Sequence, residues 1–262
     1  MSRTIYKQGP EREKRVTQGS IINHCVAEKY SCNVCGLIVT PRCDMAHLGK
    51  VTHVHYLPVV PFEEWFKVDG VHYLWTKALE KYKVKVQNTC KAKGFPTSNL
   101  GEKQLRQLCD SITDSKEKDK FKSDIDNYYK VHRTSPNEYK PSNDEKAKMV
   151  ANLRKGDIAA FCLIEDWREE NKFKVVLLRE LKRLDYNFAI GMASGIEEKT
   201  ISETWKNDLE YSVSKDLIYS TEAEIIPPYI ELLMERFSYN FCRVGVEDMD
   251  ENVEDVLKEI IK

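Results

Sequence analysis

Apolar residues occur in short runs, separated by turn residues, in both the first and the last third of the chain. In the first third, such runs predict strands at 20–22, 36–40 and 51–60. Pro58 falls in the third run and Pro61 directly follows it, and proline cannot donate to a strand ladder. We therefore expect this strand to end there or to lie at a sheet edge.

The middle of the chain has a helical pattern. An aromatic-rich stretch over 62–85 predicts one short and one longer amphipathic segment packed on the sheet. Residues 86–148 are mostly charged, with Phe121 and Ile125 at helical spacing. This section predicts two or three helices with solvated faces, closed by a polar loop at 134–145.

The last third returns to short apolar runs before a helical end. Residues 154–166 and 172–184 flank a polar turn and predict a β-hairpin, with a third strand over 186–195. A helix is predicted after Pro228, and a final helix over 252–261. The apolar stripe of the first of these helices consists of Ile230, Leu233, Met234, Phe237 and Phe241.

These patterns together predict an α+β fold. We expect a small, barrel-like sheet that contains a zinc knuckle, an inserted charged helical section, and C-terminal helices that complete the core. The predicted regions are a polar lead-in at 1–18, a zinc-binding β-rich region at 19–85, the helical insertion at 86–150, and the hairpin with the C-terminal helices at 151–262.

Composition narrows the function only slightly. The 262 residues include 41 basic and 42 acidic side chains, so net charge does not indicate a nucleic-acid partner, although a local basic face stays open. No run approaches the roughly 20 apolar residues that span a bilayer, and the charged N-terminus lacks a signal core. We expect a cytoplasmic protein with no membrane partner, in which cysteines stay reduced.

The stretch from Cys25 to His55 carries the strongest chemical signal. It holds four of the eight cysteines and three of the six histidines in 31 residues. At its centre, Cys32 and Cys35 are two residues apart and Gly36 follows, a spacing typical of a tight knuckle around tetrahedral zinc. The sequence therefore predicts zinc as the cofactor.

Five residues compete for four zinc positions. Cys32, Cys35 and Cys43 come first, and Cys25 is favoured as the fourth ligand, with His47 as the alternative. Four protein ligands would close the site, which predicts a structural ion and no catalytic water. Asp44, directly after Cys43, is expected to hold the ligand loop through hydrogen bonds.

Three enzymatic alternatives start from the same stretch. A nuclease of the HNH type would use Asp44 and His47, with His47 as base. A Cys–His nucleophile would pair Cys43 with His47 or His55. An open zinc site would use His53 and His55, which alternate along one strand face. The closed structural site is preferred over all three, so we expect a protein that is not an enzyme.

Two segments resemble a loosely defined group of uncharacterised bacterial proteins. Their pattern joins Ser/Thr-x-x-Cys-Asp-Leu near the N-terminus to a C-terminal Phe-x-x-x-Phe-x-Arg-Val-Gly helix. This chain has Thr40 to Met45 at the first place and Phe237 to Gly245 at the second, whereas Ser20 and the Cys32–Cys35 pair depart from the pattern. The resemblance implies a component of a bacterial signalling or phage-defence operon, with Cys43, Asp44 and the helix in a common core.

The sequence thus predicts a zinc-stabilised, regulatory protein that binds another protein of the same prokaryotic system. Arg236 and Arg243, seven residues apart on the predicted C-terminal helix, are the candidate partner-binding residues. The runner-up is the metal-dependent nuclease with Asp44 and His47.

Overall fold

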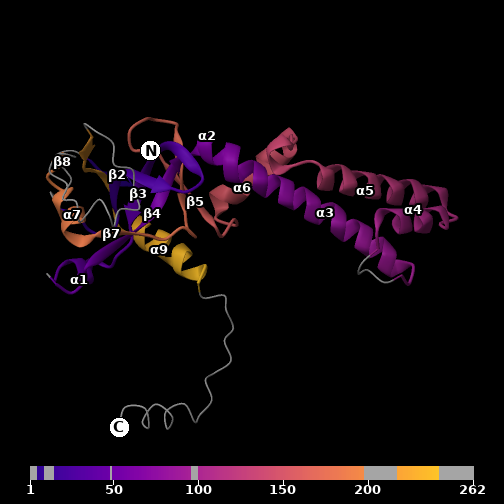
Figure 1. Ribbon diagram of the computed structural model, residues 1–262, viewed down its shortest axis with the longest axis horizontal. Helices are drawn as coiled ribbons and strands as arrows, with labels where there is room; N and C mark the ends of the chain where they lie inside the picture. The colour runs from indigo at the N-terminus through magenta and orange to yellow at the C-terminus, as the bar shows by residue number, and fades with distance from the viewer. Residues whose placement is uncertain (1–4, 9–14, 48, 96–99, 198–216, 242–262) are drawn as a thin grey trace, which may run out of the picture.

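The computed structural model describes residues 5–8, 15–47, 49–95, 100–197 and 217–241. Over these residues the protein is mixed α+β, as the sequence predicts, with one large antiparallel sheet and several helices (Figure 1). The strands of the large sheet are β1 (Tyr6–Lys7), β2 (Ser20–Ala27), β3 (Tyr30–Ile38), β4 (His53–Pro61), β5 (Phe161–Glu165), β6 (Phe173–Leu177), β7 (Lys182–Asp185) and β10 (Thr221–Ile225).

The sheet is curled. Its strand order is β1-β10-β2-β3-β4-β6-β5, and β7 pairs with the first half of β4. The two edge strands, β1 and β5, approach each other. A hydrogen bond joins them, which the Tyr6 hydroxyl on β1 donates to the Glu165 carbonyl on β5 at 2.6 Å. The result is a half-barrel that is closed at one end of β5 and open along the rest of it. A second, two-stranded sheet pairs β8 (Ile196–Glu197) with β9 (Ile218–Tyr219).

Of the two alternatives predicted from Pro58 and Pro61, the end of the strand is confirmed, because β4 ends at Pro61, and the position at a sheet edge is wrong. β4 is central and pairs with β3, β6 and β7. The register explains why Pro58 is tolerated. The hydrogen bond from Val39 N to His55 O fixes the alternation of the β3–β4 ladder, so the nitrogen of Pro58 points away from β3. On that side, pairing with β7 ends at Tyr56 and pairing with β6 begins at Val59.

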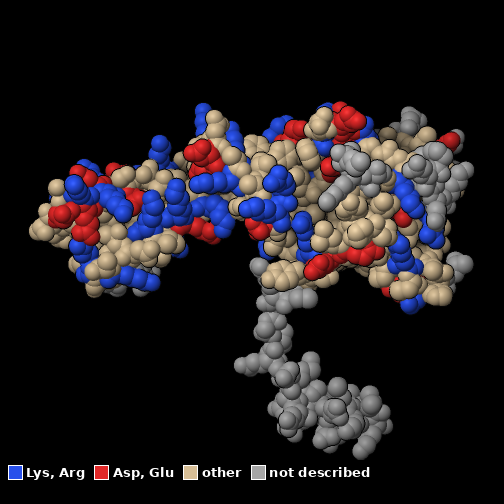
Figure 2. Space-filling model, turned by 180° about the vertical axis from the view of Figure 1, so that it is seen from behind, with Lys and Arg blue, Asp and Glu red and all other residues tan. Residues whose placement is uncertain are grey.

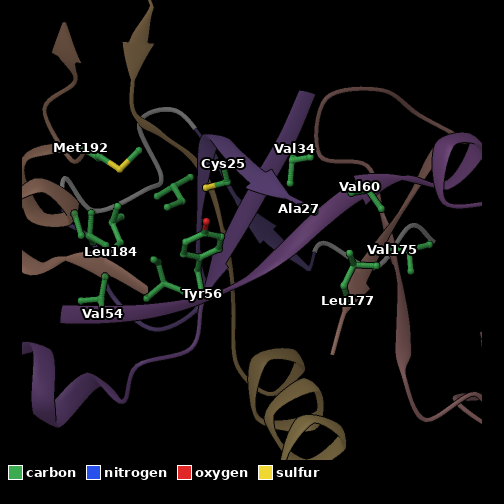
Figure 3. Close-up of a cluster of buried hydrophobic side chains, with 14 of the residues drawn as sticks. Cys25, Ala27, Val34, Val54, Tyr56, Val60, Val175, Leu177, Leu184 and Met192 are labelled. Atoms are coloured by element: carbon green, nitrogen blue, oxygen red, sulfur yellow. The ribbon is translucent and has the colours of Figure 1, made fainter. Parts of the chain in front are cut away.

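Both faces of the sheet are covered by packed side chains. On one face, Val34, Tyr56 and Val175 belong to a cluster that also takes in buried residues of α2, α3, α6 and α7 (Figure 3). On the other face, Leu37 and Val176 pack with residues of α9.

The helices are α1 (Arg42–Met45), α2 (Phe62–Trp65), α3 (Val71–Ala92), α4 (Glu102–Asp110), α5 (Ser115–Arg133), α6 (Asn143–Lys155), α7 (Tyr186–Gly191) and α9 (Tyr229–Tyr239), with a π-helical turn η2 (Phe66–Gly70) and a 3₁₀ turn η3 (Pro136–Glu138).

The inserted section between β4 and β5 is helical from α2 to α6. Within it, α3, α4 and α5 form an arm that extends away from the sheet (Figure 1). The arm has a separate cluster of buried residues, to which Cys90, Leu105 and Phe121 belong. At its base, the indole nitrogen of Trp75 donates to the carbonyls of Val131 and Thr134, which fixes the end of α5 against α3.

The predicted hairpin is confirmed, but the third strand predicted after it is wrong. β5 and β6 pair from Phe161 with Leu177 to Glu165 with Phe173. Residues 186–191 form α7 instead of a strand, because the Asp185 carboxylate accepts the Phe188 N–H at 3.0 Å and starts the helix. α9 matches the helix predicted after Pro228, whereas the final helix predicted at 252–261 lies outside the described residues.

Candidate functional site

The outer edge of β5 is the starting point of the candidate site. Among the described residues, β5 pairs with β6 alone. The hydrogen bonds from Leu178 N to Ala160 O and from Asp166 N to Lys172 O fix the alternation of this ladder. The backbone N–H and C=O of Leu163 therefore point away from β6, toward the open side of the sheet.

A groove with a volume of about 710 Å³ runs along this edge. Its walls come from both sides of β5, because α6 packs over one sheet face and α9 over the other. The side chains that line it are mostly apolar. They are Ile5, Phe62, Val150, Arg154, Cys162, Leu163, Ile164, Glu165, Phe173, Ile225, Tyr229, Leu232, Leu233 and Arg236.

Three of these side chains are large, apolar and exposed. Val150 on α6 is 42% exposed, Phe173 on β6 is 41% exposed, and Leu232 on α9 is 50% exposed. They come from three separate elements and converge on one groove. Isolated exposed apolar residues are ordinary on protein surfaces, but a contiguous apolar hollow bounded by charged residues is typical of a binding site.

The groove has charged groups of opposite sign at its two ends. Arg154 and Arg236 lie near the start of β5, where the Arg236 guanidinium donates to the Cys162 sulfur at 3.5 Å. Arg236 also lies over Gly156, at which a Cβ atom would come within 2.6 Å of the guanidinium carbon. Glu165 ends β5 at the other end of the groove. A second hollow of about 450 Å³, beyond Arg236, contains Asp157 and Glu235.

Two groups beside the groove are held neutral by burial. Burial raises the pKa of the Cys162 thiol, an effect that the nearby Arg236 opposes. Burial, followed by the adjacent Glu165 carboxylate, raises the pKa of the Tyr6 phenol. Cys162 therefore packs as a neutral, buried thiol, and Tyr6 stays a hydrogen-bond donor to β5.

The residues of the predicted zinc knuckle lie on regular strands. Cys32 and Cys35 both belong to β3, and Cys32 packs on one face of the sheet while Cys35 is buried in the cluster on the other. No knuckle turn is formed between them, because residues an odd number apart on a strand point to opposite faces. Cys25 on β2 is buried in the same cluster as Tyr56 (Figure 3).

Gly36 has a packing role in this arrangement. A Cβ atom there would lie 2.7 Å from the Cys25 sulfur and 2.8 Å from the Tyr56 ring. Burial raises the pKa of Cys25 well above its ordinary value, and that of Cys35 to about 12. Gly36 thus leaves room for the Cys25 thiol and the Tyr56 ring to pack against β3. This packing explains the glycine without a metal site.

Cys43, Asp44 and His47 lie together around α1, on the surface. The exposed Cys43 thiol approaches the Asp44 carboxylate at 3.7 Å, and Asp44 forms an ion pair with Lys50. The hydrogen bond from Lys50 lowers the pKa of Asp44. His47 is exposed in the turn that follows α1. None of these three residues lines the groove.

The described residues contain no group of three or more His, Cys, Asp or Glu side chains placed to hold a metal ion. The zinc ligand set of Cys25, Cys32, Cys35 and Cys43, with His47 as alternate, therefore stays a prediction of the sequence. The same is true of Asp44 and His47 as nuclease residues. Arg243, one of the two predicted partner-binding arginines, lies outside the described residues, whereas Arg236 lines the groove.

Sequence reasoning missed most of the groove. Leu163, Val150 and Phe173 look like ordinary members of apolar patterns, and the patterns do not reveal which edge of β5 remains unpaired. The usable signal was the stripe on α9, which continues outward through Leu232.

None of the helices described here is long and apolar enough to cross a membrane. Comparisons with protein-family models, curated proteins and solved structures find no match to this chain.

Proposed function

We propose that this protein is a partner-binding component and that the groove along β5 is its docking site. We call this site the β5 groove and define it by Val150, Leu163, Phe173, Leu232 and Arg236. The observation that carries the proposal is the convergence of exposed apolar side chains from α6, β6 and α9 beside a strand edge that no described residue pairs with.

The occupant is an apolar polypeptide segment that bears a carboxylate. Apolar walls favour apolar side chains, since burying them removes about 25 cal/mol per Å² of unfavourable contact with water. Arg154 and Arg236 supply the complementary charge, because guanidinium groups bind carboxylates in paired hydrogen bonds. The bacterial resemblance of the sequence would make the partner another protein of the same multi-protein system.

A selection experiment tests the proposal with a defined probe. A library of random nonapeptides with free carboxyl termini is displayed and selected against the wild-type protein. We expect enriched peptides that carry consecutive apolar residues and a carboxylate at the C-terminal end. Recovery of no such peptide above the level found with an unrelated control protein would contradict the proposal.

Two exposed leucines provide a matched pair of variants. Leu232→Asp places a carboxylate in the β5 groove and should abolish binding of the enriched peptides. Leu181→Asp makes the same change at a residue of similar exposure, 44%, that does not line the groove, and should leave binding unchanged. Equal binding by the two variants would move the docking site elsewhere on the protein.

A further inference from the structure

The β5 groove is built along a strand edge, and its geometry specifies how a segment would lie in it. We propose that the bound segment is an extended strand that pairs antiparallel with β5, with its carboxyl end beside Arg154 and Arg236. This inference rests on the proposed function and names the conformation and direction of the partner segment.

Backbone groups of β5 are available for such a strand. The β5–β6 register directs the N–H and C=O groups of Phe161, Leu163 and Glu165 away from β6. The Phe161 N–H bonds to the Ile158 carbonyl, and the Glu165 carbonyl accepts the Tyr6 hydroxyl. Among the described residues, the Leu163 N–H, the Phe161 C=O and the Glu165 N–H have no other partner, and the Leu163 C=O accepts only a long contact from the Cys162 thiol at 3.9 Å, so these groups can pair with a new strand. An unpaired edge of this kind is a template for strand addition.

The walls of the groove match the side chains of an added strand. Successive residues of a strand point to opposite faces. Alternate side chains of the bound segment would therefore contact Val150 and Phe173 on one side of β5, and Tyr229 and Leu232 on the other. Because both walls are apolar, the segment should be apolar at consecutive positions, as strands covered on both faces are.

The charges at the two ends of the groove set the direction. An antiparallel strand runs from the Glu165 end of β5 to the Phe161 end. Its carboxyl end then meets Arg154 and Arg236, and its amino end lies near Glu165. A parallel strand would place its carboxyl end beside Glu165, where like charges repel.

Strand addition would also complete the sheet. Within the described residues, the N-terminal segment approaches β5 at its Glu165 end, through Tyr6 on β1 and through a hydrogen bond from Gln8 to the Trp167 carbonyl. The remaining length of the β5 edge faces the groove. A strand inserted there would cover the exposed edge, which closed barrels do by pairing every strand.

The test uses the most enriched nonapeptide from the library, labelled with fluorescein, and two variants at one position. Leu163→Pro removes the outward N–H but leaves the β6 ladder intact, and proline is accepted at such edge positions. Leu163→Ala removes the side chain and keeps the N–H. We expect Leu163→Pro to bind the peptide at least about tenfold more weakly than Leu163→Ala, since one backbone hydrogen bond and close approach are lost. Equal binding would overturn strand addition while the proposed function stands.

Measurements on the wild-type protein avoid any folding defect of the proline variant. The peptide should slow hydrogen exchange of the Leu163 amide, and N-methylation of the peptide on alternate residues should abolish binding in one register and not in the other. Insensitivity in both registers would overturn the inference. A second result would also overturn it. If the Leu163 amide exchanges slowly in the free protein and rapidly after deletion of residues 1–4, the chain itself occupies the β5 edge.

The direction is tested with the same peptide as a free acid and as a C-terminal amide. We expect the amide to bind about tenfold more weakly to the wild type, and Arg154→Glu to reduce this difference. Recovery of no peptide from the library would overturn both this inference and the proposed function. A peptide that pairs with β5 but binds equally as acid and amide would overturn only the antiparallel direction.

Discussion

The curled sheet and the helical arm depend on contacts of very different range. Tyr6 and Glu165, which join the two edges of the sheet, are 159 residues apart. The buried residues of the arm's own cluster all lie between Val86 and Ile125. The arm is therefore assembled from neighbours along the chain, whereas the sheet forms only when distant segments meet.

The two regions also differ in charge. Residues 71–133, which form α3, α4 and α5, contain 14 basic and 8 acidic side chains, a net charge of +6, and the rest of the chain contains 27 and 34, a net charge of −7. Basic and acidic groups are interspersed on the arm (Figure 2), and several form surface pairs such as Arg106 with Asp126. Such pairs contribute little stability, so the arm depends on its own small core.

From this difference we expect the arm to lose order at a lower free energy than the sheet. Local elements with small cores open with lower free energy than the sheet they adjoin. The β5 groove belongs to the sheet side of this division, because its walls are β5, β6, α6 and α9. Partner binding at the groove should therefore survive changes in the arm.

The largest effect is expected from a matched pair of phenylalanine truncations. Phe188 on α7, which packs on the large sheet, is fully buried, and Phe121 on α5 in the arm is 1% exposed. Phe188→Ala should lower the free energy of unfolding of the sheet by about 3–5 kcal/mol, through lost burial and the cavity it leaves. Phe121→Ala should speed hydrogen exchange in α4 and α5 and leave the sheet amides protected. Equal loss of sheet protection in both variants would show that the protein unfolds as one unit.

A smaller effect is expected from a matched pair of glycines. Gly36→Ala puts a methyl group within 2.7 Å of the Cys25 sulfur, so thermal or urea unfolding should show a loss of about 1–3 kcal/mol from overpacking. Among the described residues, a methyl group from Gly101→Ala at the start of α4 meets only the Gln104 side chain, at 3.8 Å. Its cost should stay below about 1 kcal/mol, because only the capping preference changes. A neutral Gly36→Ala would mean that β3 is less tightly packed than described.

The smallest effect is expected at Cys43, and here the zinc hypothesis makes the opposite prediction. In the part of the chain that the structure describes, the exposed thiol has a hydrogen-bond contact with Asp44 alone, so Cys43→Ser should change the free energy of unfolding by no more than about 0.5 kcal/mol. A closed zinc site would instead lose stability together with its metal. Elemental analysis of both proteins, with melting curves, separates the two outcomes. One zinc ion per wild-type chain that is lost in Cys43→Ser would place Cys43 in a structural metal site.

The cysteines show where sequence reasoning reaches its limit. The spacing of Cys32 and Cys35 is compatible with a knuckle or with a strand, and the choice depends on whether β2 and β4 pair with this segment. Once they do, the two thiols must lie on opposite faces. Pro58 shows the same limit, because its tolerance in a central strand depends on where β7 ends and β6 begins.

The sequence by itself determined the α+β class, the helical middle section, the β5–β6 hairpin and the apolar stripe of α9. These features arise from residue spacing within a few turns or between adjacent strands, and local patterns carry that information. Tertiary structure alone decided which strand became an open edge, which cysteines were separated, and that Arg236 and Leu232 meet Val150 and Phe173 in one groove. The reason is physical, since pairing and packing between distant segments depend on the whole chain and leave no period in the sequence.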